Sequence, residues 1–172
     1  MILVKPEIKY ASQIKNYKNT FLERNETLAG CGKLMNCETA TEWIKSTKDI
    51  ENPDTCPSNW TPTTAFLAID DETDTLVGII DFRHNINHPI LSSWGGHIGY
   101  SVLPEFRRKG YGSKMLSLLL DECREFGLNK VMIACDDNNE GSRKIIEANG
   151  GEYECNVVVS EDRQVKKYWI SL

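Results

Sequence analysis

Long hydrophobic runs are missing from this sequence. No apolar stretch approaches the roughly 20 residues that a helix needs to cross a bilayer. The apolar run in the opening segment, MILVKPEIKY, is too short for a secretory signal peptide. We therefore expect a cytoplasmic protein with no membrane partner.

Basic charge is also scarce. The formal net charge is −5 at pH 7, and the densest basic cluster, Arg107-Arg108-Lys109, is short. Proteins that bind nucleic acid usually present a basic face to the phosphates, so we expect no nucleic-acid partner. The 172 residues, 40% of them hydrophobic, are enough to bury a core, and we expect one domain over residues 1–172.

Paired cysteine motifs are absent as well. None of the six cysteines forms a C-x-x-C, and no histidine lies near a cysteine pair. Cys123 and Cys135 sit in apolar stretches, where a free cysteine behaves as a small hydrophobe. This usage predicts free thiols in a reducing compartment and no bound metal.

The apolar periodicity predicts the element order β-α-α-β-β-β-α-β-α-β-β. After a short first strand, helical spacing runs over residues 10–29 until Gly30, and a second helix precedes a proline-containing loop at 52–63. The runs TTAFLAI and TLVGIIDF, joined by the acidic turn DDETD, predict a hairpin. Two closing runs, from residues 152 and 164, predict an antiparallel pair.

The centre of the chain, residues 97–135, predicts a strand-helix-strand unit. Its helix presents Met115, Leu119, Cys123 and Phe126 on one face and ends at a glycine. The run KVMIAC is typical of a strand buried on both faces, as in a parallel pair. A right-handed crossover with parallel strands follows, which places the chain in the α/β class.

The stretch PEFRRKGYGSKM stands at the start of that helix. The first amides of a helix have no internal partner, and two glycines let the backbone curl around a phosphate group. The alternative is a glycine turn with a solvated basic patch. A P-loop is excluded because the lysine precedes its glycine, and a dinucleotide fingerprint is excluded because the third glycine is missing.

The pattern that does match is [QR]-x-x-G-x-[GA], from Arg107 to Gly112. Here the chain resembles the GNAT (Gcn5-related N-acetyltransferase) superfamily. The preceding V-L-P-E-F-R and the later N-E-G-S-R-K-I-I-E-A-N-G-G resemble two further parts of the family pattern. The resemblance implies a mixed, twisted sheet of about seven strands, with the central parallel β-α-β unit flanked by helices.

The resemblance also implies a site for acetyl-coenzyme A. The pantetheine arm would pair with backbone at Val102 and Leu103, and the Val102 amide would stabilise the developing oxyanion. The loop would hold the pyrophosphate through amides and positive charge, and Asn139 and Ser142 would contact the pantetheine arm, unless they only cap their helix. The implied cofactor-binding residues are Val102, Leu103, Arg107, Arg108, Lys109, Gly110, Tyr111, Gly112, Ser113, Asn139 and Ser142.

Two positions depart from the family. Many members carry a tyrosine acid where this chain has Ile146, and those that acetylate ribosomal-protein N-termini carry a glutamate where it has Ala134. We therefore discount that substrate class. Replacement catalytic candidates are His97, Asp81 and Tyr168; Tyr100, His84 and Glu105 are weaker ones, and a water relay is an alternative.

The functional prediction is an acetyl-CoA-dependent N-acetyltransferase that acts on a small amine, amino acid or peptide. The alternative is a non-catalytic acyl-CoA-binding sensor or interaction module. Four tryptophans and several carboxylates in the segments expected to bind the acceptor suit a cationic amine, although tryptophans are also ordinary core residues. The sequence is compatible with a monomer or a homodimer.

Overall fold

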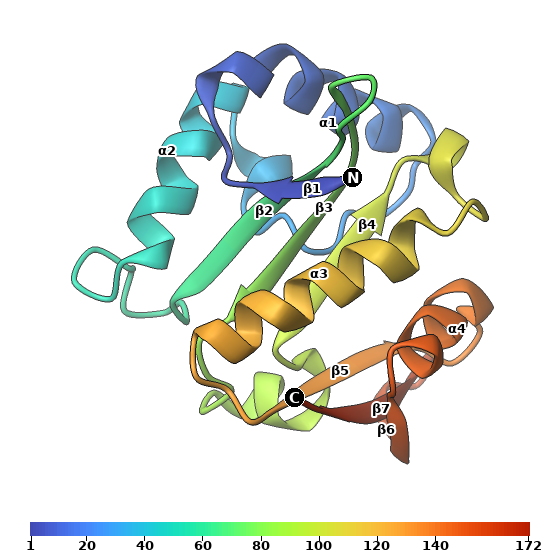
Figure 1. Ribbon diagram of the computed structural model, residues 1–172. Coiled ribbons are helices and arrows are strands. Elements are labelled where there is room, and N and C mark those ends of the chain that lie inside the picture. Colours follow the sequence, from blue (N-terminus) through green and yellow to red (C-terminus); the bar gives the residue numbers. More distant parts are fainter.

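The computed structural model describes residues 1–172 and has the predicted order of strands and helices (Figure 1). The strands are β1 Ile2–Val4, β2 Thr63–Asp70, β3 Thr75–Arg83, β4 Ile98–Val102, β5 Lys130–Asp136, β6 Glu152–Ser160 and β7 Arg163–Ser171. The main helices are α1 Ala11–Glu23, α2 Ala40–Glu51, α3 Tyr111–Glu125 and α4 Glu140–Ala148. No helix combines the length and apolar character needed to span a membrane.

The seven strands form two sheets. Strands β1-β2-β3-β4 make an antiparallel sheet that contains the predicted β2–β3 hairpin, and β5-β7-β6 make a second antiparallel sheet that contains the predicted closing pair. The mixed α/β class is confirmed. The central unit β4-α3-β5 is present. No ladder of hydrogen bonds joins β4 to β5, so β4 ends one sheet and β5 ends the other.

Helices cover both faces of the four-stranded sheet, because its strands carry apolar side chains on both faces. Ile80 and Phe82 of β3 pack in the core formed with α3, and Ile79 packs in the core formed with α1 and α2. Asp81 shares the face of Ile79, because successive side chains in a strand alternate. A carboxylate therefore lies where the pattern of burial calls for an apolar residue.

Local backbone geometry sets the ends of two helices. Helix α1 ends at Glu23 and not near Gly30, because Asn25 takes a left-handed φ of 54° and the Glu26 amide donates to the Phe21 carbonyl at 3.0 Å. Helix α3 ends before Gly127, as predicted. Phe126 lies outside the predicted core face: its side chain is half-exposed and meets the ring of Phe82 edge to face.

Candidate active site

Strands β4 and β5 touch at one point and then separate. The His97 amide donates to the Met132 carbonyl at 2.7 Å, and the Met132 amide donates to His97 Nδ1 at 2.9 Å. Gly96 allows this approach: its φ is +66°, and a Cβ there would lie 2.6 Å from the Met132 carbonyl oxygen. The imidazole takes the place of the next backbone acceptor in the ladder, and beyond it the two strands are unpaired.

A cleft of about 710 Å³ fills the gap that this divergence leaves. It is walled by β4, the loop before α3, the N-terminal half of α4 and the segment after α1. The predicted residues that line it are Val102, Arg107, Arg108, Gly110, Gly112, Ser113, Asn139 and Ser142. The structure thus brings eight of the eleven predicted cofactor residues to one cleft.

One end of the cleft is the N-terminus of α3. Gly110 precedes the helix with φ 85°, no side chain caps it, and the first helical bond is that of the Lys114 amide to the Gly110 carbonyl at 3.1 Å. Amides of Tyr111, Gly112 and Ser113 therefore have no intrahelical partner. Arg108 is also left-handed, with φ 61°, which bends the loop into a concave turn. The arrangement suits an anionic group such as a phosphate.

Arg107 connects this loop to the end of β4. Its Nε donates to the Val102 carbonyl at 2.9 Å, and its Nη2 pairs with Glu26 at 2.5 Å. The pKa of Glu26 is lowered by its hydrogen bonds to Arg107 and Arg24. Part of the positive charge of Arg107 is therefore neutralised inside the chain.

Three predicted cofactor residues do not line the cleft. The Leu103 amide donates to the Val77 carbonyl at 2.9 Å, and its side chain is buried. The Tyr111 hydroxyl donates to Asp70 Oδ2 at 2.6 Å, and Lys109 lies over the ring of Phe106. Backbone N–H and C=O groups point alternately to the two sides along β4. Those of Tyr100 and Val102 face away from β3, which the predicted pairing of Val102 with the pantetheine arm requires. Those of Leu103 face β3.

At the α4 side of the cleft, Ser142 links α4 to β4. Its hydroxyl lies 2.7 Å from the Tyr100 hydroxyl, and its amide donates to Asn139 Oδ1 at 3.0 Å. Asn139 therefore caps α4, the alternative that the sequence left open, and also lines the cleft. Burial raises the pKa of Tyr100, which keeps its hydroxyl protonated as a donor.

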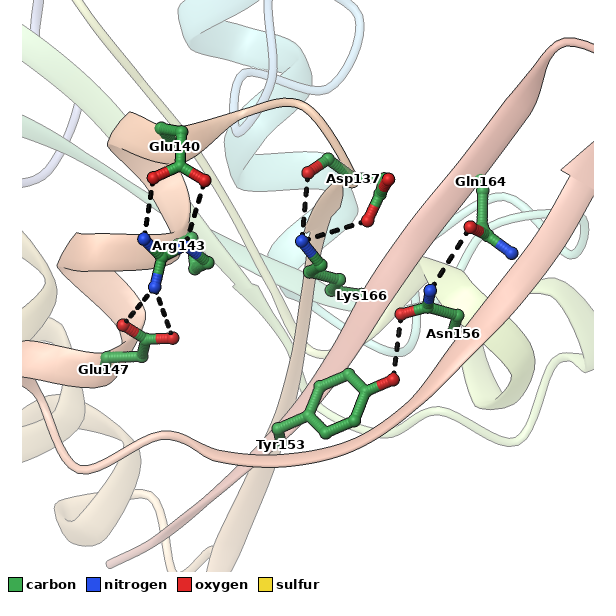
Figure 2. A network of polar contacts seen from close by, with 8 residues as sticks. All are labelled: Asp137, Glu140, Arg143, Glu147, Tyr153, Asn156, Gln164 and Lys166. Carbon is green, nitrogen blue, oxygen red and sulfur yellow. Dashed lines mark hydrogen bonds and ion pairs between the residues drawn. The ribbon is translucent and has the colours of Figure 1, made fainter.

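Charged side chains pair with one another on α4 and in the turn before it. Arg143 lies between Glu140 and Glu147, and Lys166 of β7 reaches Asp137 in the turn before α4 (Figure 2). The Arg143 pairs lie within α4, whereas the Lys166 contact joins β7 to the turn that carries Asn139. The network engages Arg143 and Lys166 with acids, so their charges are not free to meet a ligand.

The three predicted catalytic residues lie in different places. His97 is buried, its Nδ1 accepts from Met132, and burial followed by the charge of Arg83 lowers its pKa to about 4. Tyr168 is buried in the core with Ile146 and does not line the cleft. Asp81 is buried on the opposite face of the sheet from α3. Neither His97 nor Tyr168 therefore has the geometry of a proton carrier at the cleft.

Comparison with known proteins agrees with this architecture. The family model described as Acetyltransferase (GNAT) domain matches residues 12–152, which is most of the chain. The chain belongs to the GNAT acetyltransferase family. The resemblance seen in the sequence is thereby confirmed. No protein of curated function matches significantly.

Solved structures share the fold at low identity. A ribosomal-protein-S5-alanine acetyltransferase from Vibrio fischeri is 18% identical with a TM-score of 0.70, covering 99% of this chain and 91% of its own. A mutant of the spermidine N-acetyltransferase SpeG from Vibrio cholerae is 17% identical, with a TM-score of 0.66 and coverages of 99% and 95%. The microcin C7 self-immunity acetyltransferase MccE, solved with acetyl-CoA and AMP, is 17% identical, with a TM-score of 0.65 and coverages of 99% and 91%.

Sequence reasoning undervalued two features of the site. Tyr100 was only a weak candidate, because nothing in the pattern HIGYSV indicates that its hydroxyl meets Ser142 across 42 residues. Glu26 was not singled out, because it lay inside a predicted helix. The helix ends earlier and lets Glu26 reach Arg107. The left-handed preference of asparagine at position 25 was the signal that could have found it.

Proposed function

We propose that this protein is an acetyl-CoA-dependent N-acetyltransferase with a primary amine as acceptor. One observation carries the proposal: the cleft at the β4–β5 divergence has an uncapped, glycine-initiated helix N-terminus at one end and a pair of hydroxyls at its α4 wall. Family membership and the acetyl-CoA complex of MccE support the same cofactor.

In this proposal the pyrophosphate lies on the amides of residues 111–113, with Arg108 adding charge. The pantetheine arm follows β4, where the backbone groups of Tyr100 and Val102 face the cleft. The neutral amine attacks the thioester carbon, a C–N bond forms and the C–S bond breaks. The nitrogen gives up one proton to the Ser142–Tyr100 hydroxyl pair, and the pair gives one proton to the leaving sulfur, so that an amide and a free thiol are formed.

The roles of the remaining predicted residues are revised accordingly. We assign His97 to structure, as the side chain that joins β4 to β5, and Tyr168 to the core. Among the three catalytic candidates, Asp81 is the one that we retain.

A second candidate is a non-catalytic acyl-CoA-binding protein. The observation that favours it is Ile146, which occupies the position of the family's usual tyrosine acid and is fully buried in the core. This candidate keeps the cofactor cleft and lacks turnover.

Calorimetric titration with acetyl-CoA tests the cofactor site, on the wild type and on Gly110→Glu. The matched control is Gly127→Glu at the other end of α3: both glycines have positive φ, and a Cβ added at either one would have no neighbouring atom within 4 Å. We expect binding by the wild type and the control and none by Gly110→Glu. Failure of the wild type to bind acetyl-CoA overturns the proposal.

Release of free thiol separates the two candidates. With acetyl-CoA and a panel of primary amines, amine-dependent thiol release supports the transferase. Tight acetyl-CoA binding with no release for any amine supports the binding protein instead.

A further inference from the structure

A second cavity, of about 850 Å³, lies on the face of the four-stranded sheet that α1 and α2 cover. Its walls come from the segment after α1, helix α2, the loop before β2, the ends of β2 and β3, and the loop after β3. The charged side chains that line it are Lys33, Asp81 and Arg83, and Trp43 and Trp60 add aromatic surface. The volume suits a small molecule.

This cavity and the cofactor cleft are neighbours. Ala29 lines the cleft, and Cys31 and Gly32 line the second cavity. Between them Gly30 rests on Gly99 of β4 so closely that a Cβ at Gly30 would lie 2.3 Å from the Gly99 carbonyl oxygen. Here the wall between the two spaces consists of glycine backbone without side chains.

Asp81 is the only carboxylate that lines the second cavity, and one of its two oxygens has no hydrogen-bond donor in the chain. Its side chain is 3% exposed, and Oδ1 is buried without a hydrogen-bond partner. The nearest cation is Arg83, whose Nη2 lies 3.7 Å from Oδ1. A buried carboxylate oxygen without a hydrogen-bond donor is costly, and a donor supplied by a ligand would reduce that cost.

Asp81 also lies beside the cofactor cleft. It is paired with Gly99 in the β3–β4 register, and a Cβ at Gly99 would lie 3.2 Å from Asp81 Oδ1. The next residue of β4, Tyr100, lines the cleft. An ammonium group bound to Asp81 would therefore lie close to the end of the cleft nearest the β4–β5 contact.

The two cations of the cavity have spare donors. Arg83 makes one long hydrogen bond, from Nη1 to the Gly96 carbonyl at 3.4 Å, besides its distant contact with Asp81. Lys33 forms no ion pair in the structure and lies over the ring of Trp60, 4.8 Å from its centroid. With two cations and one carboxylate, the cavity is matched to a ligand that carries both an amine and an acid group.

We propose that this cavity binds the acetyl acceptor and that the acceptor is a small zwitterion with the chemistry of an amino acid. Its ammonium group binds Asp81, which takes the ammonium proton before attack, and its carboxylate binds Arg83 and Lys33. This inference rests on the proposed function for the transfer step, but ligand binding in the cavity can be measured without the cofactor.

The test is calorimetric titration of the cofactor-free protein with three pairs of ligands that differ by one carboxylate. The pairs are L-lysine with 1,5-diaminopentane, L-phenylalanine with 2-phenylethylamine, and L-alanine with ethylamine. We expect at least one amino acid to bind, and to bind at least tenfold more tightly than its decarboxylated partner. If no amino acid binds more tightly than its partner, the proposal is overturned.

Two variants locate the binding. Asp81→Asn should weaken the amino acid at least tenfold, and Arg83→Gln should abolish the preference over the decarboxylated amine. The controls are Asp49→Asn and Arg124→Gln, which change exposed residues outside the cavity and should bind as the wild type does. Wild-type binding by both cavity variants contradicts the proposal.

Acetyl-CoA titration and thermal melting of the same variants distinguish a local effect on the cavity from a loss of folding or of the cofactor site. Retained acetyl-CoA affinity with lost amino-acid binding assigns the effect to the cavity. If amino acids bind as expected and acetyl-CoA does not bind the wild type, the proposed function fails and the zwitterion site stands.

Discussion

Replacement of Asp81 by asparagine should stabilise the protein at neutral pH. The side chain is almost completely buried, and one carboxylate oxygen has no hydrogen-bond partner. An unsatisfied buried polar group costs about 1–3 kcal/mol, and more when it is charged. Asparagine keeps the shape and removes the charge, and Arg83 loses little because its side chain is 23% exposed and can be hydrated.

The pH dependence gives the sharper test. Burial raises the pKa of Asp81, against the opposing influence of Arg83 and the amides of Gly99 and Gly32. The folded state therefore binds the proton more tightly than the unfolded state, and stability falls as pH rises from the ordinary aspartate pKa through the folded one. The neighbouring thiol of Cys31 stays neutral over this range, because burial raises its pKa further.

Urea unfolding of the wild type and Asp81→Asn between pH 4 and 8 measures this effect. We expect the variant to be more stable by about 1–3 kcal/mol at pH 7, or roughly 2–4 °C in melting temperature for each kcal/mol. The difference should shrink as pH falls toward 4, because the unfolded aspartate also begins to bind the proton there. A variant that is less stable than the wild type at pH 7 would refute the reasoning, because Asp81 would then be a satisfied structural residue.

Substitutions at three further positions test the site. His97→Ala leaves the Met132 amide without its acceptor and should cost about 1–3 kcal/mol in urea unfolding, whereas His97→Asn should retain most of the stability. Because the folded pKa of His97 is lowered to about 4, the contribution of His97 to stability is lost as pH falls from about 6.5 toward 4, and this part of the pH dependence should be absent in His97→Asn. Gly110→Ala should cost about 1–2 kcal/mol, since its φ is +85°. Glu26→Gln frees Arg107 and should tighten acetyl-CoA binding by about 0.2–1 kcal/mol at low salt, measured by calorimetry.

Each of these predictions can be contradicted by a specific result. Equal stability of the alanine and asparagine variants at position 97 would mean that Nδ1 makes no useful bond. A neutral effect of Gly110→Ala would mean that the loop is not held in its left-handed turn. If the gain in acetyl-CoA affinity of Glu26→Gln persists at high salt, the cause is a change in the shape of the cleft and not the freed charge of Arg107.

The element order and the glycine loop before α3 are features that the sequence by itself determined. Strand and helix periodicities differ, so local pattern was enough to place each element, and Gly110 next to basic residues marked the start of α3 as a site for an anion. Family membership followed from the same local motifs. The end of α1 was missed, because a single left-handed asparagine outweighed an apolar periodicity that continues beyond it.

Only the tertiary structure decided how the candidate catalytic side chains are placed. His97 and Met132 are far apart in the chain, so nothing local shows that the imidazole completes a strand contact. Tyr100 meets Ser142, and Asp81 loses its solvent, through packing of elements that are separate in sequence. Burial and hydrogen-bond partners set the charge and reach of a titratable group, and both depend on contacts that the fold alone creates.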